Sequence, residues 1–177
     1  MLAELIDVLP TMADLAGLTL PSDEVFDGKS LSSVIETPND NGIADALKPY
    51  AISQYMRCPK NVSNNDPAMY WKDNDCLFTD RVLIEFFGYS IRTAHWRFTE
   101  WTKFNGSSLS PDHSEDGLVG VELYSHTPGG NGLGYSFDAF ENENEAEANP
   151  DVVKTMRTLL HKFIANQTRI ASLSLPQ

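Results

Sequence analysis

The chain has 177 residues, 41% hydrophobic and 21% charged, which is the composition of one folded globular domain rather than of a disordered segment. Its 13 basic and 25 acidic residues give a formal charge of −12 without any Lys/Arg block, which argues against a nucleic-acid partner. No apolar run approaches the roughly 20 residues needed to cross a bilayer, so no membrane span is expected.

The N-terminal segment shows a helical pattern. Apolar residues spaced as on one helix face predict an amphipathic helix over 3–16 that is ended by Gly17. Pro10 lies inside this pattern and is expected to kink the helix or to remove one of its hydrogen bonds. Nothing earlier in the chain offers a surface for that apolar face. A short helix is predicted to follow, with Ser30 as its N-cap and Glu36 near its end.

The middle of the chain favours strands and loops. Segments rich in β-branched and aromatic residues predict strands at 50–55, at 86–103 as two consecutive strands turning near 94–95, and at 119–124. Polar segments rich in Asn, Asp, Gly, Ser or Glu are expected as loops at 38–42, 60–80, 105–117 and 127–150.

The C-terminal segment predicts a second main helix. Asp151 is placed as its N-cap, the helix reaches about Ala165, and the tail from Asn166 is expected to fray. With about four short strands gathered between two main helices, the order favours an α+β fold with a small antiparallel sheet packed against the C-terminal helix.

A search for a complete catalytic site finds none: the chain has no nucleophile elbow, no phosphate-binding Gly-rich loop and no His-Glu-x-x-His. The four histidines are scattered. His95 is interpreted as a turn residue and His161 as a structural or solvent-facing one, while His113 and His126 lie in acidic loops where an incidental metal contact is conceivable. We therefore expect no catalytic residue, metal or cofactor in this chain.

Two cysteines and three glycosylation triplets bear on the compartment. Cys58 and Cys76 are either two free thiols or one loop-closing disulfide, and the sequence leaves both open. Asn-x-Ser/Thr triplets at Asn61, Asn105 and Asn166 predict possible N-glycosylation. They favour an origin in a longer parent protein of the secretory pathway. The first residues lack the basic region of a signal peptide, so the localisation of the chain itself stays unknown.

A series of short motifs resembles the C-terminal portion of sulfatases, in particular of iduronate-2-sulfatase-like members. In chain order the matching segments are the Asp-x-x-Pro-Thr helix ending in Ala-Gly at 5–18, Asp-Gly-x-Ser-Leu at 27–31, Ser-Gln-Tyr-x-Arg at 53–57, Gly-Tyr-Ser-Ile-Arg-Thr with its Trp-rich continuation at 88–101, and Glu-Leu-Tyr at 122–124. The family's acidic Asp-Pro turn after Glu-Leu-Tyr is replaced here by a Gly- and Glu-rich segment.

The resemblance implies a parent sulfuric ester hydrolase acting on sulfated glycans such as glycosaminoglycans. Such enzymes use a formylglycine, made from the Cys of Cys-x-Pro-Ser-Arg, beside a Ca²⁺ ion. Neither Cys58 nor Cys76 fits that motif, and the family's metal and catalytic residues precede the matched segment, so none is carried over. We expect a fragment that is inactive alone, whose partner is the missing catalytic portion. The parent would be lysosomal or extracellular.

The resemblance also divides the chain. Residues 1–48 would end the catalytic α/β domain, with the first helix at its edge, and residues 49–177 would form the C-terminal subdomain. Gln54 and Arg57 are candidates for the rim of the substrate cleft, although an ordinary strand-end hydrogen bond or surface ion pair is the favoured interpretation. The alternatives are a stand-alone carbohydrate-binding or interaction module using Trp96 and Trp101, and a degraded gene product.

Overall fold

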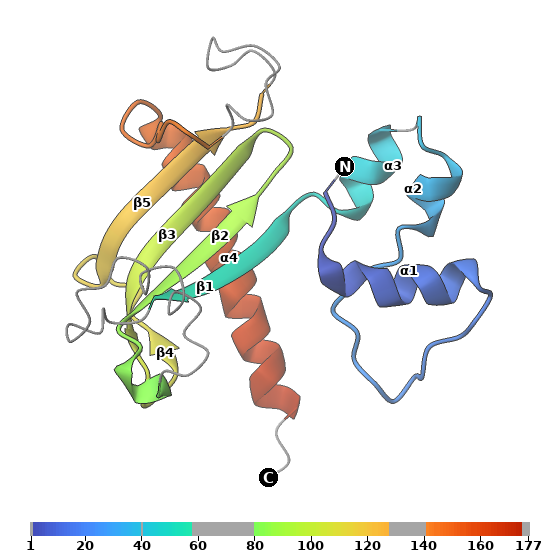
Figure 1. Ribbon diagram of the computed structural model, residues 1–177, viewed down its shortest axis with the longest axis horizontal. Coiled ribbons are helices and arrows are strands. Elements are labelled where there is room, and N and C mark those ends of the chain that lie inside the picture. Colours follow the sequence, from blue (N-terminus) through green and yellow to red (C-terminus); the bar gives the residue numbers. More distant parts are fainter. Residues whose placement is uncertain (1, 40, 58–79, 128–140, 175–177) are drawn as a thin grey trace, which may run out of the picture. The chain divides into compact units, whose positions relative to one another are not determined.

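The computed structural model describes residues 2–39, 41–57, 80–127 and 141–174 (Figure 1). They form two compact units: unit 1 consists of residues 1–52 and 92–96, and unit 2 of the remainder. The architecture is α+β with a small antiparallel sheet, as predicted. None of the helices in the described ranges combines the length and the apolar character that a membrane crossing requires.

Unit 1 is mainly helical. Its elements are the 3₁₀ helix η1 (Leu5–Asp7) and the α-helices α1 (Val8–Leu15), α2 (Ser32–Glu36) and α3 (Asn41–Leu47). The predicted first helix is therefore confirmed. Pro10 is the third residue of α1, where backbone N–H groups have no intrahelical partner, so it costs no hydrogen bond and requires no kink. Gly17 ends the helix with a φ of 67°, which only glycine adopts without strain.

Two sequence-based expectations in unit 1 were wrong. Ser30 is not the N-cap of α2: Leu31 occupies that position, and the Ser30 hydroxyl donates to Asp14 Oδ2 at 2.7 Å. The expected loop at 38–42 runs into α3, which begins at Asn41. Asn and Gly are weak helix formers, so local propensity could not predict this helix start.

A buried ion pair lies at the centre of unit 1. Asp7 is 1% exposed, and its two carboxylate oxygens lie 2.7 and 2.6 Å from Lys48 Nζ. Glu4 Oε2 approaches the same ammonium group at 2.5 Å. Burial raises the pKa of Asp7, but hydrogen bonds from Lys48 and from the backbone of Lys29 and Glu4 outweigh it and leave that pKa lowered. The ion pair thus joins the start of the helical region to the residue that follows α3.

The segment after α1 is attached to the same carboxylate. The Lys29 backbone N–H donates to Asp7 Oδ1 at 2.9 Å, and the Leu31 N–H donates to Thr11 Oγ1 at the same distance. Gly28 permits this approach, because a Cβ there would stand 1.9 Å from the Ile6 carbonyl oxygen. The Asp-x-x-Pro-Thr and Asp-Gly-x-Ser-Leu motifs are therefore hydrogen-bonded to each other.

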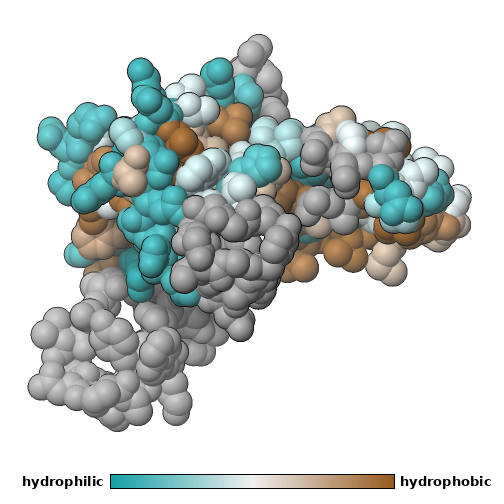
Figure 2. Space-filling model, turned by 90° about the horizontal axis from the view of Figure 1, so that it is seen from above, coloured by the Kyte–Doolittle hydropathy of each residue, from teal (hydrophilic) through white to brown (hydrophobic). Residues whose placement is uncertain are grey.

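Helix α1 and the turn before it leave their large apolar side chains exposed. Asp7 and Thr11 are buried, whereas the large apolar side chains stay at the surface: Leu5, Ile6, Val8, Leu9, Met12 and Leu15 are all at least half exposed. Figure 2 shows that apolar atoms reach the surface among hydrophilic ones. We call these six residues the α1 apolar face.

Unit 2 contains most of the sheet and the last helix. Its elements are β1 (Ala51–Arg57), which starts in unit 1, the 3₁₀ helix η2 (Arg81–Leu83), β2 (Phe86–Arg92), β3 (Trp96–Asn105), β4 (Ser110–Pro111), β5 (Leu118–Ser125) and α4 (Pro150–Ser174). The strands pair in the order β1-β2-β3-β4, with β5 also on β3. Strands β3 and β4 are antiparallel, with Phe104 opposite Pro111. The two strands predicted over 86–103 are confirmed.

Helix α4 covers one face of this sheet (Figure 1). The core between them includes the fully buried Ile91, Phe98, Leu123 and Leu160. Asp151 is not the N-cap: α4 begins at Pro150, a residue suited to the first helical position because its missing N–H has no helical partner. The helix also runs to Ser174 instead of ending near 165, since no Gly or Pro interrupts it before Pro176.

We predict that Asp7→Asn lowers the free energy of unfolding by about 3 kcal/mol, because it removes the more deeply buried of the two carboxylates that compensate the Lys48 ammonium. Urea unfolding followed by circular dichroism measures the change. The control is Asp23→Asn, at an exposed position, which should be neutral. Equal effects of the two substitutions would contradict the central role of the ion pair.

Candidate functional site

A buried carboxylate in β3 is the centre of the most distinctive polar cluster in the described residues. Glu100 lies two positions from Phe98 and two from Thr102, on the same alternating face of the strand, and both neighbours are fully buried. Its side chain is 2% exposed. A carboxylate taken out of water at a core position must be compensated by charge or hydrogen bonds.

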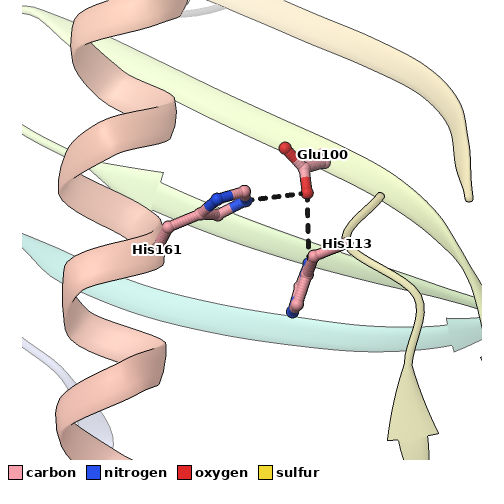
Figure 3. Close-up of side chains that lie close together, drawn as sticks. All are labelled: Glu100, His113 and His161. Carbon is pink, nitrogen blue, oxygen red and sulfur yellow. Dashed lines mark hydrogen bonds and ion pairs between the residues drawn. The ribbon is translucent and has the colours of Figure 1, made fainter. Parts of the chain in front are cut away.

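Three side chains compensate Glu100. Its Oε1 lies 3.0 Å from His161 Nε2 and 3.3 Å from His113 Nδ1 (Figure 3), and its Oε2 accepts a hydrogen bond of 2.8 Å from Arg157 Nε. Arg157 and His161 are four residues apart on α4, so they share one helix face. Glu100 therefore connects β3, α4 and the segment after β4.

His113 is placed by the chain around β4. The Asp112 N–H donates to the Lys103 carbonyl at 2.9 Å, which holds the segment beside β3. The imidazole ring lies 5.5 Å from the Tyr89 ring and 5.0 Å from the His161 ring, measured between centroids. Strands β2 and β3 and helix α4 thus orient the His113 ring.

The cluster strongly favours ionised Glu100. Burial alone raises the pKa of this carboxyl, but hydrogen bonds from His113 and His161 and the charges of His161 and Arg157 outweigh it and lower the pKa to about 2. Glu100 therefore stays a carboxylate at any physiological pH. It remains an acceptor for its neighbours or a ligand for a cation.

Glu100, His113 and His161 also have the composition of a metal-binding group. Their ligand atoms all lie within 4.8 Å of one another. The His113 Nε2 atom is buried and has no hydrogen-bond partner among the described residues. The sequence led us to expect only an incidental metal contact at His113 and a structural or solvent-facing His161. The fold instead brings both imidazoles onto one carboxylate.

The two predicted rim residues are both on β1 and both exposed, but the structure does not bring them together. Gln54 and Arg57 are three positions apart, so strand alternation places them on opposite faces. The Arg57 guanidinium carbon lies 5.3 Å from the Trp101 ring centroid, in a cation–π contact. The Trp101 ring lies against Gly88, where a Cβ would approach it to 2.7 Å, and its Nε1 donates to Glu122 at 2.9 Å.

The remaining predicted site residues are dispersed. Cys58, Cys76 and Asn61 lie outside the described residues, so the thiol and disulfide alternatives both stand. Asn105 closes a turn, with its Oδ1 accepting from the backbone of Ser107 and Ser108, and Asn166 is exposed on α4. His95 is exposed between β2 and β3, and His126 Nε2 lies 2.8 Å from Glu141.

Sequence reasoning missed Glu100, although one signal pointed to it. Alternation along 98–102 places this carboxylate on the side of the strand occupied by Phe98, which predicts a buried charge in need of partners. The identity of those partners could not be read from the sequence, because His113 and His161 are 13 and 61 residues away from it.

No protein-family model matches this chain, and no curated protein matches it. The fold and the cluster define an α+β protein whose sheet and last helix are joined through one buried carboxylate. Any proposal for its function therefore depends on its own residues and their geometry.

Because the pKa of Glu100 is lowered from 4.5 to about 2, its stabilising effect is complete above pH 4.5 and is lost as the pH falls towards 2. We predict a loss of roughly 3 kcal/mol over that range from this group. Unfolding free energies at pH 6 and pH 3 should show a smaller difference for Glu100→Gln than for the wild type. Glu143→Gln, at an exposed position, is the control, and an unchanged pH dependence in Glu100→Gln would contradict the assignment.

Proposed function

We propose that this chain is the C-terminal part of a sulfatase of the iduronate-2-sulfatase-like kind. Residues 1–48 would be the end of its catalytic domain and residues 49–177 its C-terminal subdomain. The parent would hydrolyse sulfate esters of sulfated glycans with a formylglycine and Ca²⁺ supplied by the catalytic portion. The α1 apolar face is the observation that carries this proposal.

The α1 apolar face needs a covering surface. Leu5 in η1 is 92% exposed and Met12 in α1 is 65% exposed, whereas Asp7 and Thr11 of the same segment are buried. Each such apolar side chain contributes about 1.5–3 kcal/mol when it is fully buried, so six of them represent a large free energy of association. A contiguous apolar face of this kind marks an interaction site. A helix at the edge of a larger α/β domain would present it to that domain.

The motif geometry supports the same proposal. Asp7, Pro10 and Thr11, which carry the first match to sulfatases, are all buried, and the second matching segment is hydrogen-bonded to Asp7 and Thr11. The resemblance therefore rests on residues that hold unit 1 together.

The alternative of a stand-alone carbohydrate-binding module receives less support. Sugar stacking requires a free aromatic face, whereas the Trp101 ring has Gly88 against it and the Arg57 guanidinium over it. A sugar would have to displace the Arg57 contact. Titration of the chain with neutral and sulfated glycans distinguishes the two functions, since the module would bind without any catalytic portion.

We predict that the chain, co-expressed with the catalytic portion of an iduronate-2-sulfatase-like enzyme, forms a complex through the α1 apolar face. The double variant Leu9→Lys/Met12→Lys should abolish co-purification, because two charges would be buried in an apolar contact. Its own helical content should be unchanged, since both side chains are exposed.

Leu109→Lys is the matched control for that experiment. Leu109 is as exposed as Leu9, at 55%, but lies between β3 and β4 in unit 2. It should leave complex formation intact. Co-purification that is lost equally in both variants, or in neither, would count against the α1 apolar face as the contact surface.

We also predict that the purified chain alone gives no turnover of an aryl sulfate in the presence of Ca²⁺, because it lacks a Cys-x-Pro-Ser-Arg motif. Sensitive colorimetric detection of the released phenol is the measurement. Turnover that follows the purified chain through gel filtration would defeat the proposal. An in-frame Cys-x-Pro-Ser-Arg encoded upstream of Met1 would strengthen it.

A further inference from the structure

We propose that Glu100, His113 and His161 form a binding site for one divalent transition-metal ion of the zinc class. This inference depends only on unit 2 and does not rest on the sulfatase proposal. It departs from the expectation, drawn from the sequence, that the chain carries no metal.

The distances from Glu100 Oε1 to the two imidazole nitrogens fit such an ion, and all three ligand atoms lie within 4.8 Å of one another. Zinc binds imidazole nitrogen and carboxylate oxygen at about 2.0–2.2 Å, which places neighbouring ligands of a tetrahedral site roughly 3.3 Å apart. Glu100 Oε1 already lies 3.0 Å from His161 Nε2 and 3.3 Å from His113 Nδ1. An ion entering between them needs small side-chain shifts rather than a new backbone arrangement.

The donor set selects the class of metal. Two imidazoles and one carboxylate suit zinc and its neighbours in the first transition series, whereas calcium and magnesium prefer sites built from oxygen alone. Three protein ligands leave a fourth position for water. The two imidazoles are partly exposed, so an ion can reach the site from solvent.

The ring protons of the two imidazoles can be replaced by a metal ion. To bind the ion, His113 must present an unprotonated Nδ1 and His161 an unprotonated Nε2, with each ring proton on the other nitrogen. The ionised Glu100 accepts from His113 Nδ1 and His161 Nε2, so both of these nitrogens carry protons that an incoming ion must displace. In the part of the chain that the structure describes, His113 Nε2 has no hydrogen-bond partner, so this nitrogen can take up the displaced ring proton. Replacement of the two N–H donors by a cation also leaves Glu100 compensated.

Arg157 holds the carboxylate in the required orientation. Its Nε binds Oε2, so Oε1 is left as the single oxygen directed at both imidazoles. The Arg157 charge is shared with Glu115, whose Oε1 lies 3.7 Å from the other end of the guanidinium. Arg157 is therefore a positioning residue in the second layer around the ion, where such groups commonly tune affinity.

Isothermal titration of the full 177-residue chain with Zn²⁺ tests the site. We expect one ion per chain, with affinity reduced roughly 100-fold or more in His113→Ala and in His161→Ala, a larger effect than the loss of an outer partner causes. Glu100→Gln should weaken binding as well. His95→Ala and His126→Ala are the matched controls and should bind as the wild type does, because neither residue belongs to the group formed by Glu100, His113 and His161.

Co²⁺ provides a readout that does not depend on the folding of any variant. The wild-type chain should show the intense visible absorption of four-coordinate Co²⁺, saturating at one ion per chain and removed by Zn²⁺. The spectrum of hydrated six-coordinate Co²⁺ would overturn the proposal. Unchanged Zn²⁺ affinity in the His113→Ala/His161→Ala double variant would also overturn it, since the ion would then be held by the acidic surface.

Discussion

A charge removed from water must find compensating partners, and this constraint organises both units of the protein. In unit 1 the Asp7 carboxylate binds Lys48 and the backbone of Lys29, and in unit 2 the Glu100 carboxylate binds two imidazoles and a guanidinium. The desolvation penalty of an unpaired buried carboxylate amounts to several kcal/mol, a large part of the stability of a small domain. Each carboxylate therefore fixes which distant segments meet.

The Asp7 cluster and the Glu100 cluster differ in whether solvent and ions can reach them. The Asp7 carboxylate is enclosed by an ammonium and by backbone donors, so it serves the structure of unit 1. Glu100 faces imidazoles that are partly open to solvent and that can exchange a proton for a cation. The same physical requirement thus gives a structural ion pair in one unit and the geometry of a ligand site in the other.

The proposed role of the chain follows from how unit 1 satisfies that requirement. Because Asp7 and Thr11 occupy the inner side of the first helical region, its large apolar side chains are directed outward. A helix that stood alone in water would have the opposite arrangement. The α1 apolar face and the contact between the two sulfatase-like motifs therefore have one cause, and both fit a segment that completes a larger domain.

Local patterns in the sequence determined the first helix, the strands and the last helix, because spacing of apolar residues and β-branched content act over a few neighbouring positions. They failed at α3, at the cap of α2 and at both ends of α4, where weak propensities are decided by contacts. The sequence alone also could not specify the cluster around Glu100. His113 and His161 are ordinary loop and helix residues until the sheet and α4 pack together, since only burial makes the carboxylate dependent on them.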